Sequence, residues 1–92
     1  MDGIVSTSAT IKRILAAVKA LPGSPADLAD DTDIINDVGL DSIELLSFML
    51  EVEAQMEIRI DFDRMEFSTL SSIARLAAFL DTMPSTRAAN PT

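Results

Sequence analysis

Hydrophobic residues recur at helical spacing in three stretches of this chain. The first stripe consists of Ile11, Ile14, Leu15, Val18 and Leu21. Positions i, i+3, i+4 and i+7 lie on one face of an α-helix, so this stretch is predicted to be helical and amphipathic. Ser6 and Ser8 are candidate N-caps, and Pro22-Gly23 should end the helix.

The second stretch predicts a helix from Asp41 to about Met56, in which Asp41 and Glu44 have the spacing of a capping box. The third predicts a last helix that opens at Thr69. Its apolar positions are Leu70, Ile73, Leu76, Ala77 and Leu80. Between the two, residues 63–66 could cap one further turn. The expected fold class is therefore all-α, a four-helix bundle with three longer helices and one short helix.

Residues 24–40 show no sustained period, and Pro25 and Gly39 favour a long loop. The apolar residues of this loop should pack onto the helices. They are Leu28, Ile34, Ile35 and Val38. A loop of this length inside a small domain is usually functional. We expect one domain over residues 1–82, followed by a flexible C-terminal tail over residues 83–92, which contains two Pro and several Ser and Thr.

The second predicted helix carries more apolar residues than one buried face requires. Its core-facing residues are expected to be Leu45, Phe48, Met49, Val52 and Met56. Ile43, Leu46 and Leu50 project about 100–160° away from Leu45 around the helix axis. Either another helix covers this second strip, or the strip docks a partner or a ligand, because an apolar patch beside acids suits such a contact.

A length of 92 residues allows a single hydrophobic core. Hydrophobic residues make up 48% of the chain and aromatic residues only 4%, which favours packed helices over a β-sandwich. The absence of Cys and His excludes a disulfide scaffold, thiolate metal sites and most hydrolase mechanisms. No signal peptide is evident and no apolar run approaches the roughly 18 residues of a membrane span, so a cytoplasmic protein is expected.

The net charge of −8 is concentrated in one part of the sequence. Residues 27–66 hold thirteen of the fifteen acidic residues against only Arg59 and Arg64, a net charge of −11. Such an acidic face repels nucleic-acid phosphates and anionic lipids and attracts basic protein surfaces. We therefore expect a basic partner protein, with no nucleic acid and no membrane as partners.

Ser42 stands where the acidic loop meets the second helix, one residue after the predicted cap. Most serines at helix starts are only caps. A phosphate on the Ser42 hydroxyl, however, would lie near the unpaired N–H groups and the positive end of the helix dipole. Gly39 would let the loop approach closely, since it has no side chain.

The stretch from Asp37 to Glu44, with the sequence D-V-G-L-D-S-I-E, resembles the phosphopantetheine attachment motif D-x-G-x-D-S-L of acyl carrier proteins. The similarity to the family extends to about residue 81. It implies a four-helix carrier in which Ser42 receives 4′-phosphopantetheine from a phosphopantetheinyl transferase that uses coenzyme A. Such a protein is not an enzyme, because its arm holds an acyl or aminoacyl group as a thioester for partner enzymes.

The resemblance also implies which residues the partners contact. They are Asp41, Ile43, Glu44, Leu46, Leu50 and Glu53. Asp41 corresponds to the acid before the attachment serine, and the other five correspond to apolar and acidic positions of the recognition helix. The implied partners are the transferase, an acyl- or aminoacyl-loading ligase, and a downstream acyltransferase or synthase. The carrier itself is expected to be a monomer.

Two features of the sequence, one departure from the family pattern and one local similarity, concern the cargo. Ser47, Ala54 and Gln55 stand where carriers of fatty-acid synthesis usually have acids. Residues 61–67 are similar to the F-D-R-x-E-[WF] stretch of D-alanyl and other stand-alone aminoacyl carrier proteins. We therefore favour an aminoacyl cargo, with a fatty or polyketide acyl group as the alternative.

Other functions fit these residues less well. Asp31, Asp33 and Asp37 do not match the spacing of a calcium-binding loop, and no metal site is expected. A hydrolase built on Ser42 would lack a histidine base, and the chain is small for a substrate pocket of roughly 300–1,000 Å³. The remaining alternative is an unmodified acidic helical adaptor that docks a basic partner protein through its apolar strip.

Overall fold

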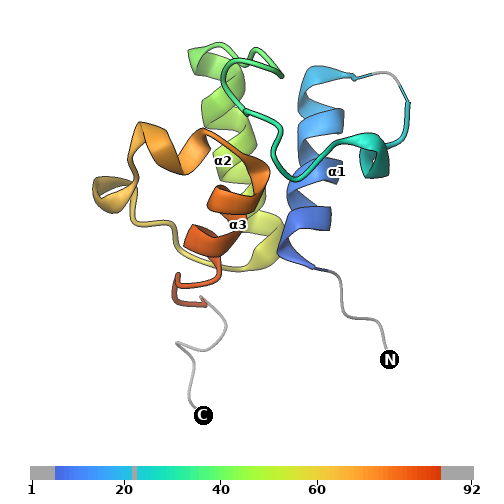
Figure 1. Cartoon of the computed structure of the whole chain (residues 1–92). Coiled ribbons are helices and arrows are strands. Elements are labelled where there is room, and N and C mark those ends of the chain that lie inside the picture. Colours follow the sequence, from blue (N-terminus) through green and yellow to red (C-terminus); the bar gives the residue numbers. More distant parts are fainter. Residues whose placement is uncertain (1–5, 22, 86–92) are drawn as a thin grey trace, which may run out of the picture.

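The computed structural model describes residues 6–21 and 23–85, in which every regular element is helical (Figure 1). The three α-helices are α1 (Thr7–Lys19), α2 (Ser42–Met56) and α3 (Ile73–Leu80). The connections contain three short 3₁₀ helices, η1 (Pro25–Asp27), η2 (Phe62–Arg64) and η3 (Phe67–Leu70). Helix α1 packs against both α2 and α3. The predicted all-α class is confirmed, and two 3₁₀ turns, η2 and η3, occupy the region of the predicted short helix.

Local sequence sets the ends of α1 and α2. Ser6 Oγ accepts a hydrogen bond from a backbone N–H of the first turn of α1, as expected of an N-cap. At the start of α2, Asp41 Oδ1 accepts from Glu44 N at 2.8 Å, and Glu44 Oε1 accepts from Asp41 N at 3.0 Å. The predicted capping box is thus confirmed. Helix α1 ends at Lys19, and Pro22 of the predicted stop lies outside the described residues.

One aliphatic core lies between the helices. Its fully buried side chains are Ile11, Ile14, Leu15, Ile34, Phe48, Val52, Ile73, Leu76 and Leu80. Burial of each such side chain stabilises the fold by about 1.5–3 kcal/mol. The loop before α2 closes this core as predicted, because Val38 is buried with Ile34, and Leu28 and Ile35 pack against its edge.

The last helix begins later than predicted. Thr69 lies within η3, whereas α3 starts at Ile73 with Ser72 as its N-cap, whose Oγ accepts from Arg75 N at 3.0 Å. In a helix that opened at Thr69, the amide of Ile73 would bond to the carbonyl of Thr69. Here Ile73 N donates instead to Thr32 O of the loop, at 3.0 Å. The loop therefore takes the amide that a continuous helix would need.

Part of the predicted tail belongs to the folded domain. Met83 is only 7% exposed and lies in the core, Arg59 N donates to Pro84 O at 3.0 Å, and Ile58 forms an antiparallel bridge with Ser85. Met83 is therefore a core residue and not the start of a tail. The rest of the expected tail, residues 86–92, lies outside the described residues. Within residues 6–21 and 23–85, no helix is both long and apolar enough to cross a membrane.

Candidate cofactor attachment site

Ser42 is the first residue of α2, and it is exposed. The cap of this helix is Asp41, so the usual role of a serine at a helix start is already filled by the preceding residue. The N–H groups of a first helical turn lack intrahelical acceptors, and the helix dipole makes this end positive. A phosphate bonded to Ser42 Oγ would therefore meet a favourable field, and the hydroxyl is not needed to cap the helix.

Gly39 serves the loop in a different way from the one expected. Its φ is +78°, a left-handed conformation that residues with a side chain rarely adopt. A Cβ atom added at Gly39 would meet no other atom within 4 Å. The glycine is therefore required by the backbone turn that leads to Ser42. The expected close approach is not seen, because no other part of the described chain comes near Gly39.

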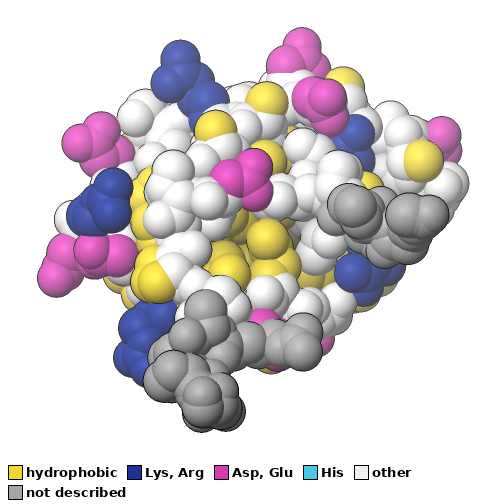
Figure 2. Space-filling view, turned by 90° about the horizontal axis from the view of Figure 1, so that it is seen from below, with side chains coloured by type: hydrophobic (Ala, Val, Ile, Leu, Met, Phe, Trp, Pro, Cys, Tyr) yellow, Lys and Arg dark blue, Asp and Glu magenta, His cyan; other side chains and the backbone are white. Residues whose placement is uncertain are grey.

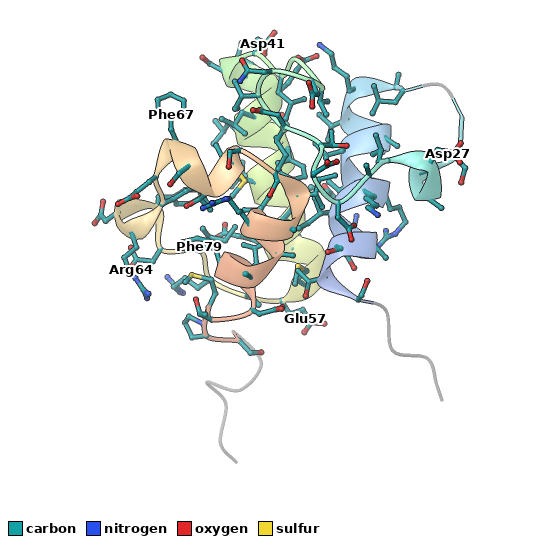
Figure 3. All side chains as sticks on the ribbon, in the orientation of Figure 1. Asp27, Asp41, Glu57, Arg64, Phe67 and Phe79 are labelled. Carbon is teal, nitrogen blue, oxygen red and sulfur yellow. The ribbon has the colours of Figure 1, made fainter. Side chains whose placement is uncertain are left out.

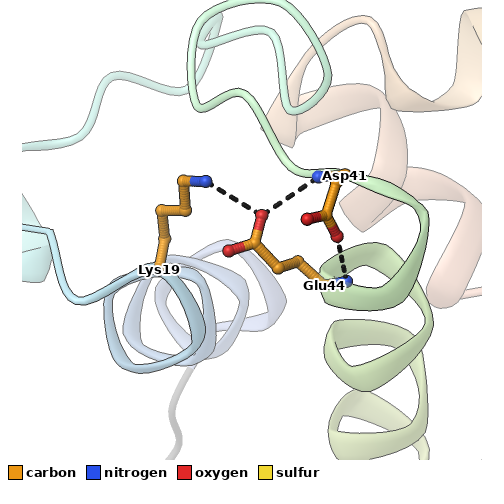
Figure 4. A network of polar contacts seen from close by, with 3 residues as sticks. All are labelled: Lys19, Asp41 and Glu44. Carbon is orange, nitrogen blue, oxygen red and sulfur yellow. Dashed lines mark hydrogen bonds and ion pairs between the residues drawn. The ribbon is translucent and has the colours of Figure 1, made fainter.

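A polar network joins the C-terminal end of α1 to the N-terminal end of α2 (Figure 4). Glu44 Oε1 accepts hydrogen bonds from Lys19 Nζ at 2.9 Å and from Asp41 N at 3.0 Å. The bond from Lys19, followed by the bond from Asp41, holds the pKa of Glu44 below its ordinary value. Glu44 therefore stays ionised, and Lys19 balances its charge beside Ser42. Sequence analysis missed Lys19, because a contact across 25 residues leaves no local signal.

The acids predicted to face partners are not equally available. Glu44 is half-buried and bonded to Lys19 and Asp41. Glu53 is also half-buried, and its Oε2 accepts from Ile60 N at 2.8 Å. Asp41 is exposed, although one carboxylate oxygen caps α2. The structure thus gives each of these three carboxylates a bond within the fold.

The apolar strip of α2, defined as Ile43, Leu46 and Leu50, is exposed. The exposed fractions are 77% for Ile43, 56% for Leu46 and 53% for Leu50. On the opposite side of the helix, Phe48 and Val52 are fully buried. The prediction of two apolar faces on α2 is confirmed, and no helix of the described residues covers the second one. The strip begins one residue after Ser42, so a protein that reaches Ser42 would meet it.

Metal binding receives no support from the acids. Within residues 6–21 and 23–85, no group of three or more Asp or Glu side chains lies close enough to hold a metal ion. Asp33 instead organises the loop, since its Oδ1 accepts from the backbone N–H groups of Ile35 and Asn36 at 2.9 and 2.8 Å. Bonds from the backbone and side chain of Asn36 lead the contacts that lower the pKa of Asp33. The Asp33 carboxylate therefore stabilises a turn of the loop.

A comparison with protein families identifies the chain. The family model described as the phosphopantetheine attachment site matches residues 10–80, a span that includes Ser42, α2 and α3. No curated protein matches the chain. Members of this family are carriers without catalytic activity, and they hold acyl or aminoacyl thioesters on a covalent 4′-phosphopantetheine. Phosphopantetheinyl transferases modify these carriers, which then serve synthases. The chain belongs to the phosphopantetheine attachment family and is a carrier protein.

Proposed function

We propose that Ser42 is the residue that carries the 4′-phosphopantetheine arm. The observation that supports this assignment is the combination of an exposed serine at the first position of α2 with a cap supplied by Asp41. The positive end of α2 suits the phosphate, and Lys19 balances the nearby charge of Glu44. The arm brings the thiol that this chain, which has no Cys, cannot supply for thioester chemistry.

In the attachment reaction, the chain contributes a nucleophilic oxygen and a rigid position for it. Ser42 Oγ forms a bond to the pantetheine-linked phosphorus of coenzyme A, and the nucleotide part leaves. We assign acceptance of the hydroxyl proton to the transferase, because the chain has no His to act as the usual general base. The capping box and the bond to Lys19 fix the first turn of α2 while this exchange takes place.

The apolar strip of α2 is proposed as the surface that partners contact, with Asp41, Glu44 and Glu53 at its acidic edge. Ile43, Leu46 and Leu50 support this role because their exposure costs burial energy that the fold could otherwise use. The proposed partners are the transferase, a loading ligase, and an acyltransferase or synthase. The carrier would meet each of them as a monomer.

An aminoacyl group is the proposed cargo, and a fatty or polyketide acyl group is the alternative. Ser47, Ala54 and Gln55 support this choice, because each is exposed on α2 where a carrier of fatty-acid synthesis would place an acid. Residues 61–67, similar to aminoacyl carriers, add to it. Intact mass measurement of the loaded protein, before and after hydroxylamine cleaves thioesters, would identify the class of the cargo.

The attachment site is tested by incubating the apo protein with coenzyme A and a phosphopantetheinyl transferase. The wild type should gain the mass of one phosphopantetheine, and Ser42→Ala should gain none. Ser47→Ala is the matched control, because Ser47 is an exposed serine of the same helix, and it should be modified like the wild type. Modification of Ser42→Ala at any other residue would refute the assignment.

A further inference from the structure

Two of the four phenylalanines of this chain are exposed, and both lie between α2 and α3. Phe48 is fully buried and Phe79 packs against the core, whereas Phe62 is 48% and Phe67 is 83% exposed. The ring of Phe67 points away from the bundle (Figure 3). Aromatic side chains that are exposed on a monomer and held in place are the usual anchors of protein interfaces.

The segment that presents Phe67 is anchored at both ends. Ile60 and Leu70 are buried on either side of it. The turn η3 is closed by Thr69 N, which donates to Glu66 O at 2.9 Å, and by Glu66 N, which donates to Thr69 Oγ1 at 3.3 Å. A side chain on such a fixed turn loses little backbone entropy on binding, which favours its use as an anchor.

Phe67 also lies beside the loop that leads to Ser42. It lines a surface hollow of about 320 Å³ together with Asp33, Ile35, Asn36, Ser68, Leu70 and Ser71. We call these seven residues the Phe67 surface. Ser42 follows Asn36 by six positions, and six residues of extended chain span at most about 22 Å. A typical interface of about 800 Å² per partner is roughly 32 Å across, so an enzyme bound at Ser42 can cover this hollow.

The charges around Phe67 indicate the chemistry of what covers it. Asp33, which is half-buried, lines the hollow, and the exposed carboxylates of Asp63 and Glu66 lie on the segment that presents Phe67, with Arg64 as the cation of that segment. The face seen from below carries both positive and negative side chains (Figure 2). An apolar ring with an acidic edge complements an apolar pocket with a basic rim.

We propose that the Phe67 surface is a second docking site for the phosphopantetheinyl transferase, which places Phe67 in a basic-rimmed apolar pocket while Ser42 occupies its active site. The inference rests on the proposed role of Ser42 and adds a contact outside α2. A second contact would strengthen recognition by the transferase, since the carboxylates of Glu44 and Glu53 on α2 already form bonds within the fold. A transferase that reads α2 alone would find few free carboxylates.

The test measures kcat and KM of the transferase with coenzyme A and the full-length apo protein as substrate. Phe67→Ala should raise KM at least about tenfold and leave kcat within about twofold, as truncation of an interface anchor does. Phe62→Ala is the matched control, because Phe62 lies on the same segment but lines a different hollow, of about 610 Å³, with Arg59 and Met83. Its KM should stay within about twofold of wild type.

Circular dichroism of each variant excludes unfolding, because Phe67 is so exposed that its loss should leave the thermal midpoint nearly unchanged. An unchanged KM for Phe67→Ala, or an equal rise for Phe62→Ala, would overturn the inference and leave the role of Ser42 intact. A wild type that sediments as a dimer, with Phe67→Ala as a monomer, would also overturn it, since a second copy would then cover the surface. Failure of the wild type to be modified would refute both proposals.

Discussion

The two faces of α2 predict very different losses of folding stability for two substitutions that are only two residues apart. Leu46 is 56% exposed, so it has less than half of a leucine's burial to lose. Full burial is worth about 1.5–3 kcal/mol, and Leu46→Ala should therefore destabilise the fold by about 1 kcal/mol or less. Phe48 is fully buried, and Phe48→Ala should cost about 3–5 kcal/mol because a cavity is added to the lost transfer energy.

Thermal unfolding measures both costs in one series. For a domain of this size, a loss of about 1 kcal/mol lowers the thermal midpoint by about 4–8 °C. Leu46→Ala should therefore lower the midpoint by no more than about 4–8 °C, and Phe48→Ala should lower it by at least about 12 °C. Modification by the transferase supplies the second readout, in which Leu46→Ala should react more slowly although it is folded. A loss of about 2–5 kcal/mol for Leu46→Ala would show that Leu46 is a core residue and would refute the docking strip.

Two further predictions concern the carboxylates of the loop before α2 and of the start of α2. The lowered pKa values of Asp33 and Glu44 mean that their stabilisation is complete above the unfolded-state pKa and is lost as the pH falls through the folded-state values. Lys19→Met should raise the pKa of Glu44 in an NMR titration. Lys12→Met, which breaks the 2.8 Å ion pair with Asp30, is the control and should leave the pKa of Glu44 unchanged. An equal pKa of Glu44 in the two variants would contradict the assigned cause. Asp41→Ala should lower the free energy of unfolding, measured in urea, by about 0.5–2 kcal/mol, because α2 loses its N-cap. Asp41→Asn should keep most of this stability, since Asn is also a good N-cap. Equal losses in the two variants would show that the charge of Asp41 matters and its capping bond does not.

Local signals were sufficient for the starts of α1 and α2 and for the two faces of α2. Ser6 and Asp41 cap through groups within three residues, so their chemistry is visible in the sequence. The helical period of 3.6 residues separates Phe48 from Leu46 by direction, and the exposures follow that separation. In both cases the controlling contacts lie within one or two helical turns.

Long-range contacts explain what could not be predicted. Thr69 and Ser72 are both common cap residues, and Leu70 keeps helical spacing with Ile73, so the pattern does not distinguish a 3₁₀ turn from the first turn of a helix. The bond from Ile73 N to Thr32 O decides between them. The exposure of Phe67 was missed for a similar reason, since an aromatic residue in an irregular segment carries no periodic signal.

The acidic residues take on a different meaning once their partners are known. In the sequence, their enrichment over residues 27–66 indicates a surface that attracts basic partners. In the structure, Asp33, Asp41 and Glu53 accept backbone N–H bonds that shape the loop, cap α2 and hold the chain after it. A carboxylate held in this way keeps its long-range field but cannot turn freely to form a close ion pair. Under the proposed docking roles, charge would therefore speed the encounter with a partner, while the exposed side chains of Leu46 and Phe67 would supply the close contacts.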